Sequence, residues 1–66
     1  MRTISEICID ADKATEIATF SELWAEVIAN KKKYSLVELQ FINEHLRGAC
    51  DLVNEQKFKE VLDLLR

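Results

Sequence analysis

The sequence contains no proline and only one glycine among its 66 residues. Tight hairpin turns, glycine-rich phosphate loops and disordered linkers depend on these residues, so the composition argues against all three. Cysteine and histidine are equally scarce, with Cys8, Cys50 and His45 the only examples. Three nitrogen or sulfur ligands are fewer than the four of a structural zinc site, and two cysteines do not make a secreted disulfide framework. We therefore expect no metal and no cofactor, and two free thiols packed as small apolar groups. A Cys8–Cys50 disulfide is the less favoured alternative.

The residue groupings that support catalysis are also missing. A single histidine without a strained turn argues against a Ser-His-Asp triad. His45 and Cys50 are five residues apart, which places them on different faces of a helix. Asp10 and Asp12 have the spacing of the first two EF-hand ligands, but Ala14 stands where the third ligand should be. We expect a protein that is not an enzyme.

Charge and length restrict the class of partner. The chain carries 9 basic and 12 acidic side chains, a net charge of −3, and its pI of about 5.0 makes a dedicated nucleic-acid binder unlikely. Residues 1–30 have a net charge of −4 and residues 31–66 a net charge of +1. The acidic half suits a basic protein partner, although net charge also serves solubility alone.

The length predicts one domain, residues 1–66. Chains below about 70–80 residues have little stability to spare, so association with a second copy would help this one. No run approaches the ~20 apolar residues of a membrane span, and no basic segment leads into an apolar one. We expect a cytoplasmic protein with no membrane contact.

Apolar residues recur with a helical period from residue 19 onward. Thr19 and Glu22 have the spacing of a capping box, which predicts a helix over 20–32. Ser35 and Glu38 have the same spacing before a stripe that predicts a helix over about 36–53. Its members are Leu36, Leu39, Ile42, Leu46, Ala49 and Val53.

Three details of the helix assignment remain open. Gly48 fits a helix stop or an interior position, and the unbroken stripe favours the interior. Asn54 suggests a cap or break before a last helix over 55–66, packed antiparallel against 36–53. The first 18 residues fit a helix over about 4–17, bent near Asp10–Asp12, with Thr3 and Glu6 as its capping box. Alternation of apolar residues also allows a strand. The expected fold is all-α, a small three- to four-helix bundle with 36–53 as its central helix.

The predicted helix 36–53 carries a second stripe. Its members are Val37, Phe41, His45 and Leu52. With Leu36 at zero and about 100° per residue, they lie at roughly 100–180°, nearly opposite the first stripe at roughly 220–360°. Either the N-terminal segment covers it, or it forms an interaction surface centred on Phe41 with aromatic neighbours. The candidate interaction residues are Trp24, Tyr34, Val37, Phe41, His45 and Leu52.

Lys31, Lys32 and Lys33 form the only basic run, beside Tyr34. Such a run ordinarily compensates the negative end of a helix dipole, but it also suits contact with an anion or phosphate. The leading expectation for function is a non-catalytic protein–protein interaction or regulatory module that self-associates. The alternative is a nucleic-acid-associated regulator that contacts phosphates through the three lysines.

Overall fold

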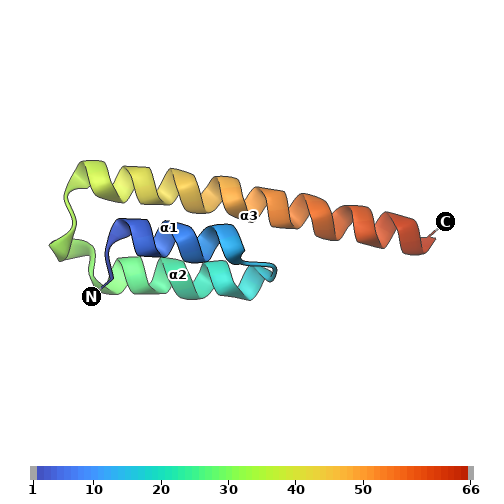
Figure 1. Cartoon of the computed structure of the whole chain (residues 1–66), viewed down its shortest axis with the longest axis horizontal. Coiled ribbons are helices and arrows are strands. Elements are labelled where there is room, and N and C mark those ends of the chain that lie inside the picture. Colours follow the sequence, from blue (N-terminus) through green and yellow to red (C-terminus); the bar gives the residue numbers. More distant parts are fainter. Residues whose placement is uncertain (1, 66) are drawn as a thin grey trace.

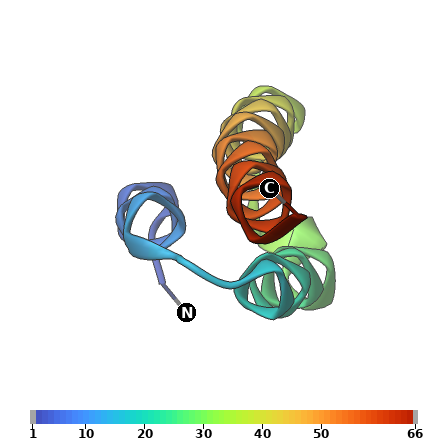
Figure 2. The same ribbon diagram turned by 90° about the vertical axis from the view of Figure 1, so that its right-hand side faces the viewer.

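The computed structural model describes residues 2–65 and shows three α-helices packed against one another, with no strand in this range. They are α1 (Ile4–Lys13), α2 (Ile17–Ala29) and α3 (Leu36–Leu65), with a short 3-10 turn, η1 (Lys31–Lys33), before α3. Successive helices reverse direction, and α3 runs along the other two and then past them (Figure 1). Seen from its C-terminal end, the molecule has one helix at each corner of a triangle (Figure 2). The prediction of an all-α fold is confirmed.

Two predicted capping boxes are present. The Glu6 amide donates to Thr3 Oγ1 at 3.3 Å, while the Thr3 amide donates to Glu6 Oε1 at 3.3 Å. Ser35 and Glu38 make the same reciprocal pair at 2.9 and 3.1 Å. Each box satisfies two of the amide groups that a helix start leaves without partners. The helical alternative for the N-terminal segment is therefore correct over Ile4–Lys13, and the strand alternative is wrong.

The predicted ends of the first two helices are wrong. Helix α1 stops at Lys13 rather than residue 17, because Ala14 takes an extended conformation. Helix α2 begins at Ile17 rather than residue 20, so Thr19 lies inside it and forms no cap. At the other end α2 stops at Ala29 rather than residue 32, and Lys31–Lys33 form the separate 3-10 turn η1. The Asn30 side chain donates to the Glu26 carbonyl at 2.9 Å, and the Asn30 backbone amide donates to the same oxygen at 3.2 Å.

The predicted break at Asn54 is absent, and the antiparallel packing of 55–66 against 36–53 is wrong. Both segments belong to the single 30-residue helix α3, although Arg66 lies outside the described residues. A fold-back needs turn residues, and no glycine or proline lies near Asn54. Asparagine costs an interior helix position only about 0.6 kcal/mol, which does not stop a helix. Gly48 is interior to α3, as predicted.

The core lies where the three helices meet. Its largest fully buried side chains are Ile7 from α1, Phe20 from α2, and Ile42 and Leu46 from α3. The inner side of α3 is thus the main stripe predicted from the sequence, except for Leu36, which is 72% exposed. The two shorter helices cannot cover the whole length of α3, because α1 and α2 have 10 and 13 residues and α3 has 30. The molecule is therefore elongated, 48 × 17 × 16 Å. We call residues 54–65, which continue α3 past most of its packing partners, the C-terminal arm.

The Asn54→Ala variant tests the continuity of α3. Alanine replaces an exposed, interior asparagine, so we expect the free energy of unfolding to rise by about 0.5 kcal/mol. A cap asparagine would give the opposite sign, a loss of about 1 kcal/mol. Urea unfolding followed by circular dichroism distinguishes the two. A loss of stability in Asn54→Ala would show that the helix is broken at this position.

Candidate interaction surface

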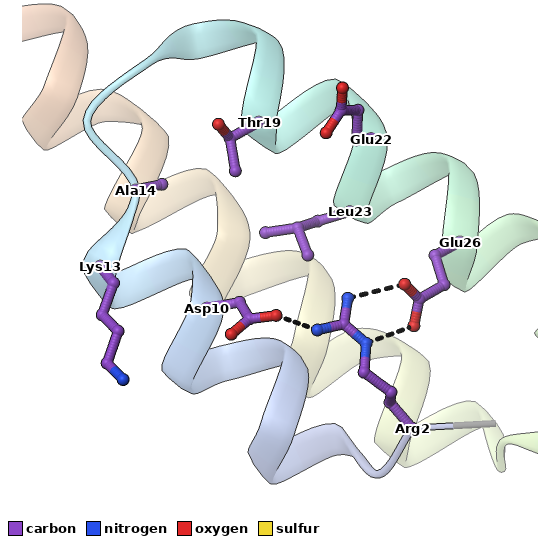
Figure 3. A pocket seen from close by; sticks show the side chains of 8 residues that line it. All are labelled: Arg2, Asp10, Lys13, Ala14, Thr19, Glu22, Leu23 and Glu26. Carbon is purple, nitrogen blue, oxygen red and sulfur yellow. Dashed lines mark hydrogen bonds and ion pairs between the residues drawn. The ribbon is translucent and has the colours of Figure 1, made fainter.

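A polar pocket of about 390 Å³ opens between α1 and α2. The side chains around it belong mainly to the facing sides of these two helices, and the Arg2 guanidinium reaches across the space between them (Figure 3). Asp10 is on the α1 side and Glu26 on the α2 side, and both point toward Arg2.

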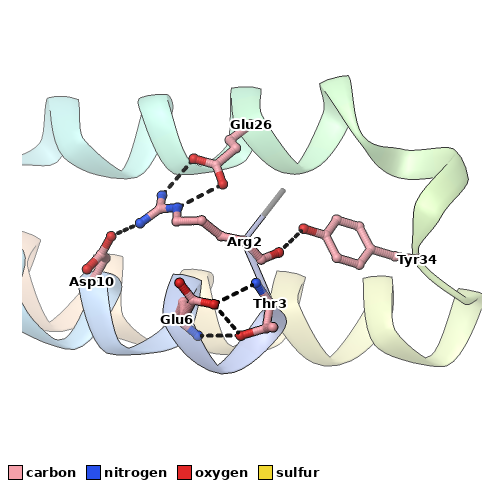
Figure 4. Close-up of polar contacts among 6 residues, drawn as sticks. All are labelled: Arg2, Thr3, Glu6, Asp10, Glu26 and Tyr34. Atoms are coloured by element: carbon pink, nitrogen blue, oxygen red, sulfur yellow. Dashed lines mark hydrogen bonds and ion pairs between the residues drawn. The ribbon is translucent and has the colours of Figure 1, made fainter.

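Arg2 forms two ion pairs at once. Its Nη2 and Nε atoms donate to the two carboxylate oxygens of Glu26, at 2.6 and 3.0 Å, and its Nη1 atom donates to Asp10. The hydrogen bonds from Arg2 lower the pKa of Glu26, against the opposing effect of desolvation. The Tyr34 hydroxyl donates to the Arg2 carbonyl at 2.9 Å and holds the same residue from the other side (Figure 4). Arg2 therefore ties the start of α1 to α2 and to the segment before α3.

This pocket offers little chemistry of its own. Two of the three carboxylates that line it, Asp10 and Glu26, are bound by Arg2, so neither is available as a base. Across residues 2–65, no three His, Cys, Asp or Glu side chains are grouped as a metal site would require. The Cys8 thiol is buried, and burial together with the nearby Asp12 carboxylate raises its pKa, which suppresses the reactive thiolate. Cys8 and Cys50 are both free.

The second stripe of α3 is mostly exposed rather than covered by α1. The exposed fractions of Val37, Phe41 and Leu52 are 74%, 57% and 69%. His45 is half-buried: its Nε2 atom lies 2.9 Å from Asp12 of α1, and its ring stacks on that of Phe41 with centroids 6.3 Å apart. The ring of His45 therefore marks the boundary between the α1 contact and the open side of α3.

The two aromatic neighbours predicted for this surface do not join it. Tyr34 is only 9% exposed and belongs to the core, so the expectation that it anchors a partner is not met. Its hydroxyl finds an internal acceptor, which is why a tyrosine can be buried there. Trp24 packs half-buried against the core, and its Nε1 atom donates to Asn43 of α3 at 3.3 Å. It fastens α2 to α3.

The three lysines of η1 are all exposed, and none forms an ion pair within residues 2–65. A 3-10 turn has about three residues per turn, so successive side chains point in directions about 120° apart. Lys31, Lys32 and Lys33 consequently fan out around the chain and do not form one flat basic patch.

The surface that sequence reasoning missed is the apolar face of the C-terminal arm. The sequence predicts that residues 55–66 pack antiparallel against residues 36–53, and that packing would cover this face. Because α3 does not fold back, the side chains are exposed by 40–78%; they are Phe58, Val61, Leu62 and Leu65. We call them the C-terminal patch. The exposure of the C-terminal patch depends on the continuation of α3 through Asn54, and the sequence carries no local signal for that continuation.

The base of the arm is fixed to the rest of the molecule. Lys57 Nζ lies 3.4 Å from Glu16 Oε1 in the segment between α1 and α2. Beside this ion pair is a shallow pocket of about 290 Å³, whose lining includes Ala14, Leu52 and Val53. The ion pair and the neighbouring contacts set the direction in which the arm leaves the body.

Comparison of the chain with protein-family models, with curated proteins and with solved structures gave no match. Among the described helices, including the long α3, none combines the length and apolar character needed to cross a membrane.

The link between Arg2 and Glu26 predicts a pH dependence of stability. The folded pKa of Glu26 is lowered from 4.5, so its contribution is present above pH 4.5 and is lost as the pH falls below that value. We expect Glu26→Gln to be less stable than the wild type at pH 7 and to lose stability less steeply between pH 5 and 3. Urea unfolding at a series of pH values measures both effects.

Arg2→Gln provides the matched variant, since it removes the partner and leaves the carboxylate. It should flatten the same part of the pH profile. Adding Glu26→Gln to Arg2→Gln should change the profile little further, because Arg2→Gln already removes the partner of Glu26, together with that of Asp10. A Glu26→Gln profile parallel to that of the wild type would contradict the assignment.

Proposed function

We propose that the chain is a non-catalytic protein–protein interaction module that self-associates through the outer side of α3. The observation that carries the proposal is the exposure of nine large apolar side chains on this helix, seven of which fall into two groups. One group is the C-terminal patch. The other, which we call the N-terminal patch, consists of Leu36, Val37 and Phe41, exposed by 57–74%. Contiguous apolar surface of this kind marks interaction sites on small proteins.

The position of these side chains supports the same function. The N-terminal patch lies on the part of α3 whose opposite side is fixed by the core residues Ile42 and Leu46, so this patch is presented on a rigid element. Phe41 also stacks on His45, which limits the freedom its ring would lose on binding. The acidic half of the chain, residues 1–30 with a net charge of −4, would favour approach of a basic partner protein.

The Phe41→Asp variant tests self-association. We expect sedimentation equilibrium of the wild type to give a mass above the 7.6 kDa of one chain, and Phe41→Asp to return it toward that value. A carboxylate placed in an apolar contact loses its hydration without gaining a partner. Because Phe41 lies outside the core, the far-ultraviolet circular dichroism should not change.

Ser21→Asp is the control, because it adds the same charge at an exposed position of α2. It should leave the mass of the wild type unchanged. A wild-type protein that sediments at 7.6 kDa at millimolar concentration would refute self-association.

Nucleic-acid binding is the second candidate, favoured by the exposed lysines of η1 that lack ion-pair partners within residues 2–65. The net charge of −3 and the divergent directions of the three side chains oppose it. We expect no shift of labelled DNA or RNA oligonucleotides in 50 mM salt. Binding that weakens steeply with salt and disappears when Lys31, Lys32 and Lys33 are changed to Gln would establish this second function instead.

A further inference from the structure

The outer side of α3 has a symmetric pattern. With Leu36 at zero and about 100° per residue, the N-terminal patch lies at roughly 0–140° and the C-terminal patch at roughly −20 to 80°. Both patches therefore lie outside the sector of the fully buried residues Ile42 and Leu46, at roughly 240–280°. Between the patches, within the sector of roughly −20 to 140°, the exposed residues are polar or glycine: Gln40, Asn43, Glu44, Arg47, Gly48, Asp51, Asn54 and Glu55. The exposed Leu52 lies at the edge of this sector, at about 160°. An apolar group at each end and a polar middle suit a partner with the same pattern.

We propose that two copies of the chain pair along this side of α3 in antiparallel orientation, about a two-fold axis that crosses the helix near Gly48 and Ala49. The inference rests on the proposed function and specifies its partner and geometry. The midpoint between the two patches falls at about residue 50, so the axis brings the N-terminal patch of each copy onto the C-terminal patch of the other. Such an isologous contact is closed and limits assembly to a dimer.

Charge complementarity selects the antiparallel orientation. An axis at residue 49 places Arg47 of each copy opposite Asp51 of the other, and both residues are exposed without an ion pair within residues 2–65. The same axis brings Lys33 beside the C-terminal end of the other α3, where the helix dipole is negative. A parallel pair would instead oppose Arg47 to Arg47 and Asp51 to Asp51.

Gly48 supplies an independent indication. A Cβ atom added to it would meet nothing within 4 Å, so no contact within the chain requires a glycine in the interior of this helix. The absence of a side chain at this point allows a second helix to approach closely, because the distance between packed helices depends on the side chains at their contact. Figure 2 shows α1 and α2 grouped on one side of α3, which leaves its outer side open.

The available area is sufficient for the full length of α3 but not for the arms alone. The exposed fractions of the seven patch residues, on side chains of roughly 150–200 Å² each, amount to about 700 Å² of apolar surface per copy. A standard interface buries about 800 Å² per partner. The C-terminal patch alone would provide about half of the estimated apolar area, so contact between two arms falls short.

A charge exchange tests the orientation. Arg47→Asp and Asp51→Arg each place only like charges around the proposed axis, so each should weaken self-association at least about tenfold. The double variant restores opposite charges across the axis and should return the dissociation constant to within about threefold of the wild type. Sedimentation equilibrium measures all four proteins. Glu22→Arg, a charge reversal on α2, is the control and should associate like the wild type.

The Gly48→Leu variant tests the crossing point. The open space around Gly48 allows the side chain within one copy, so the circular dichroism should be retained. At the axis, however, it would separate the two helices and weaken self-association at least about tenfold.

These experiments separate the arrangement from the proposed function. A wild-type dimer whose single charge variants associate normally, or whose double variant is not restored, would overturn the antiparallel arrangement and leave self-association standing. A Gly48→Leu protein that associates as tightly as the wild type would overturn the crossing at Gly48. A wild type that remains monomeric would overturn both proposals, and would point to a different protein as the occupant of this side of α3.

Discussion

The structure depends on the burial of the inner side of α3 against two shorter helices. Ile42 and Leu46 are almost completely buried where they meet Ile7 of α1 and Phe20 of α2. Two helices of 10 and 13 residues cannot cover a helix of 30. The exposed apolar surface of the arm therefore follows from the difference in length, and so does the elongated shape. The ion pairs of Arg2 and of Lys57 fix the ends of the shorter helices but do not change this relation.

Much of the fold could be predicted from the sequence, because it rests on local signals. The inner stripe of α3 follows from its spacing, and the capping boxes at Thr3 and Ser35 follow from a hydroxyl and a carboxylate three residues apart. The same spacing at Thr19 was misleading, since Glu16 lies extended there and the helix begins three residues earlier than predicted. A hydroxyl and a carboxylate three residues apart therefore do not by themselves fix where a helix begins, because tertiary contacts also influence its first residue.

The surface was harder to predict than the core. Phe41 was identified because it lies opposite the inner stripe, and its exposure follows from where α1 packs. Tyr34 was named as an aromatic neighbour of Phe41, yet it is buried, and its hydroxyl donates a hydrogen bond to the carbonyl of Arg2, 32 residues away. The prediction for the arm was wrong because Asn54 was interpreted as the end of a helix, whereas α3 continues through it. Neither the long-range acceptor nor the continuation of a helix through one unfavourable residue has a local signature.

The arm has one further consequence, which concerns cooperativity within α3. Isolated helices of about 12 residues are marginal in water, because forming the first turn fixes several dihedral angles for a single hydrogen bond. In α3 the packed half provides that first turn, and the arm only extends it. Opening of the arm from its free end is then the lowest-energy fluctuation of the molecule, and amide hydrogens beyond Lys57 should exchange with solvent before those of the core. A partner that binds the arm meets a helix already nucleated and suppresses its fraying.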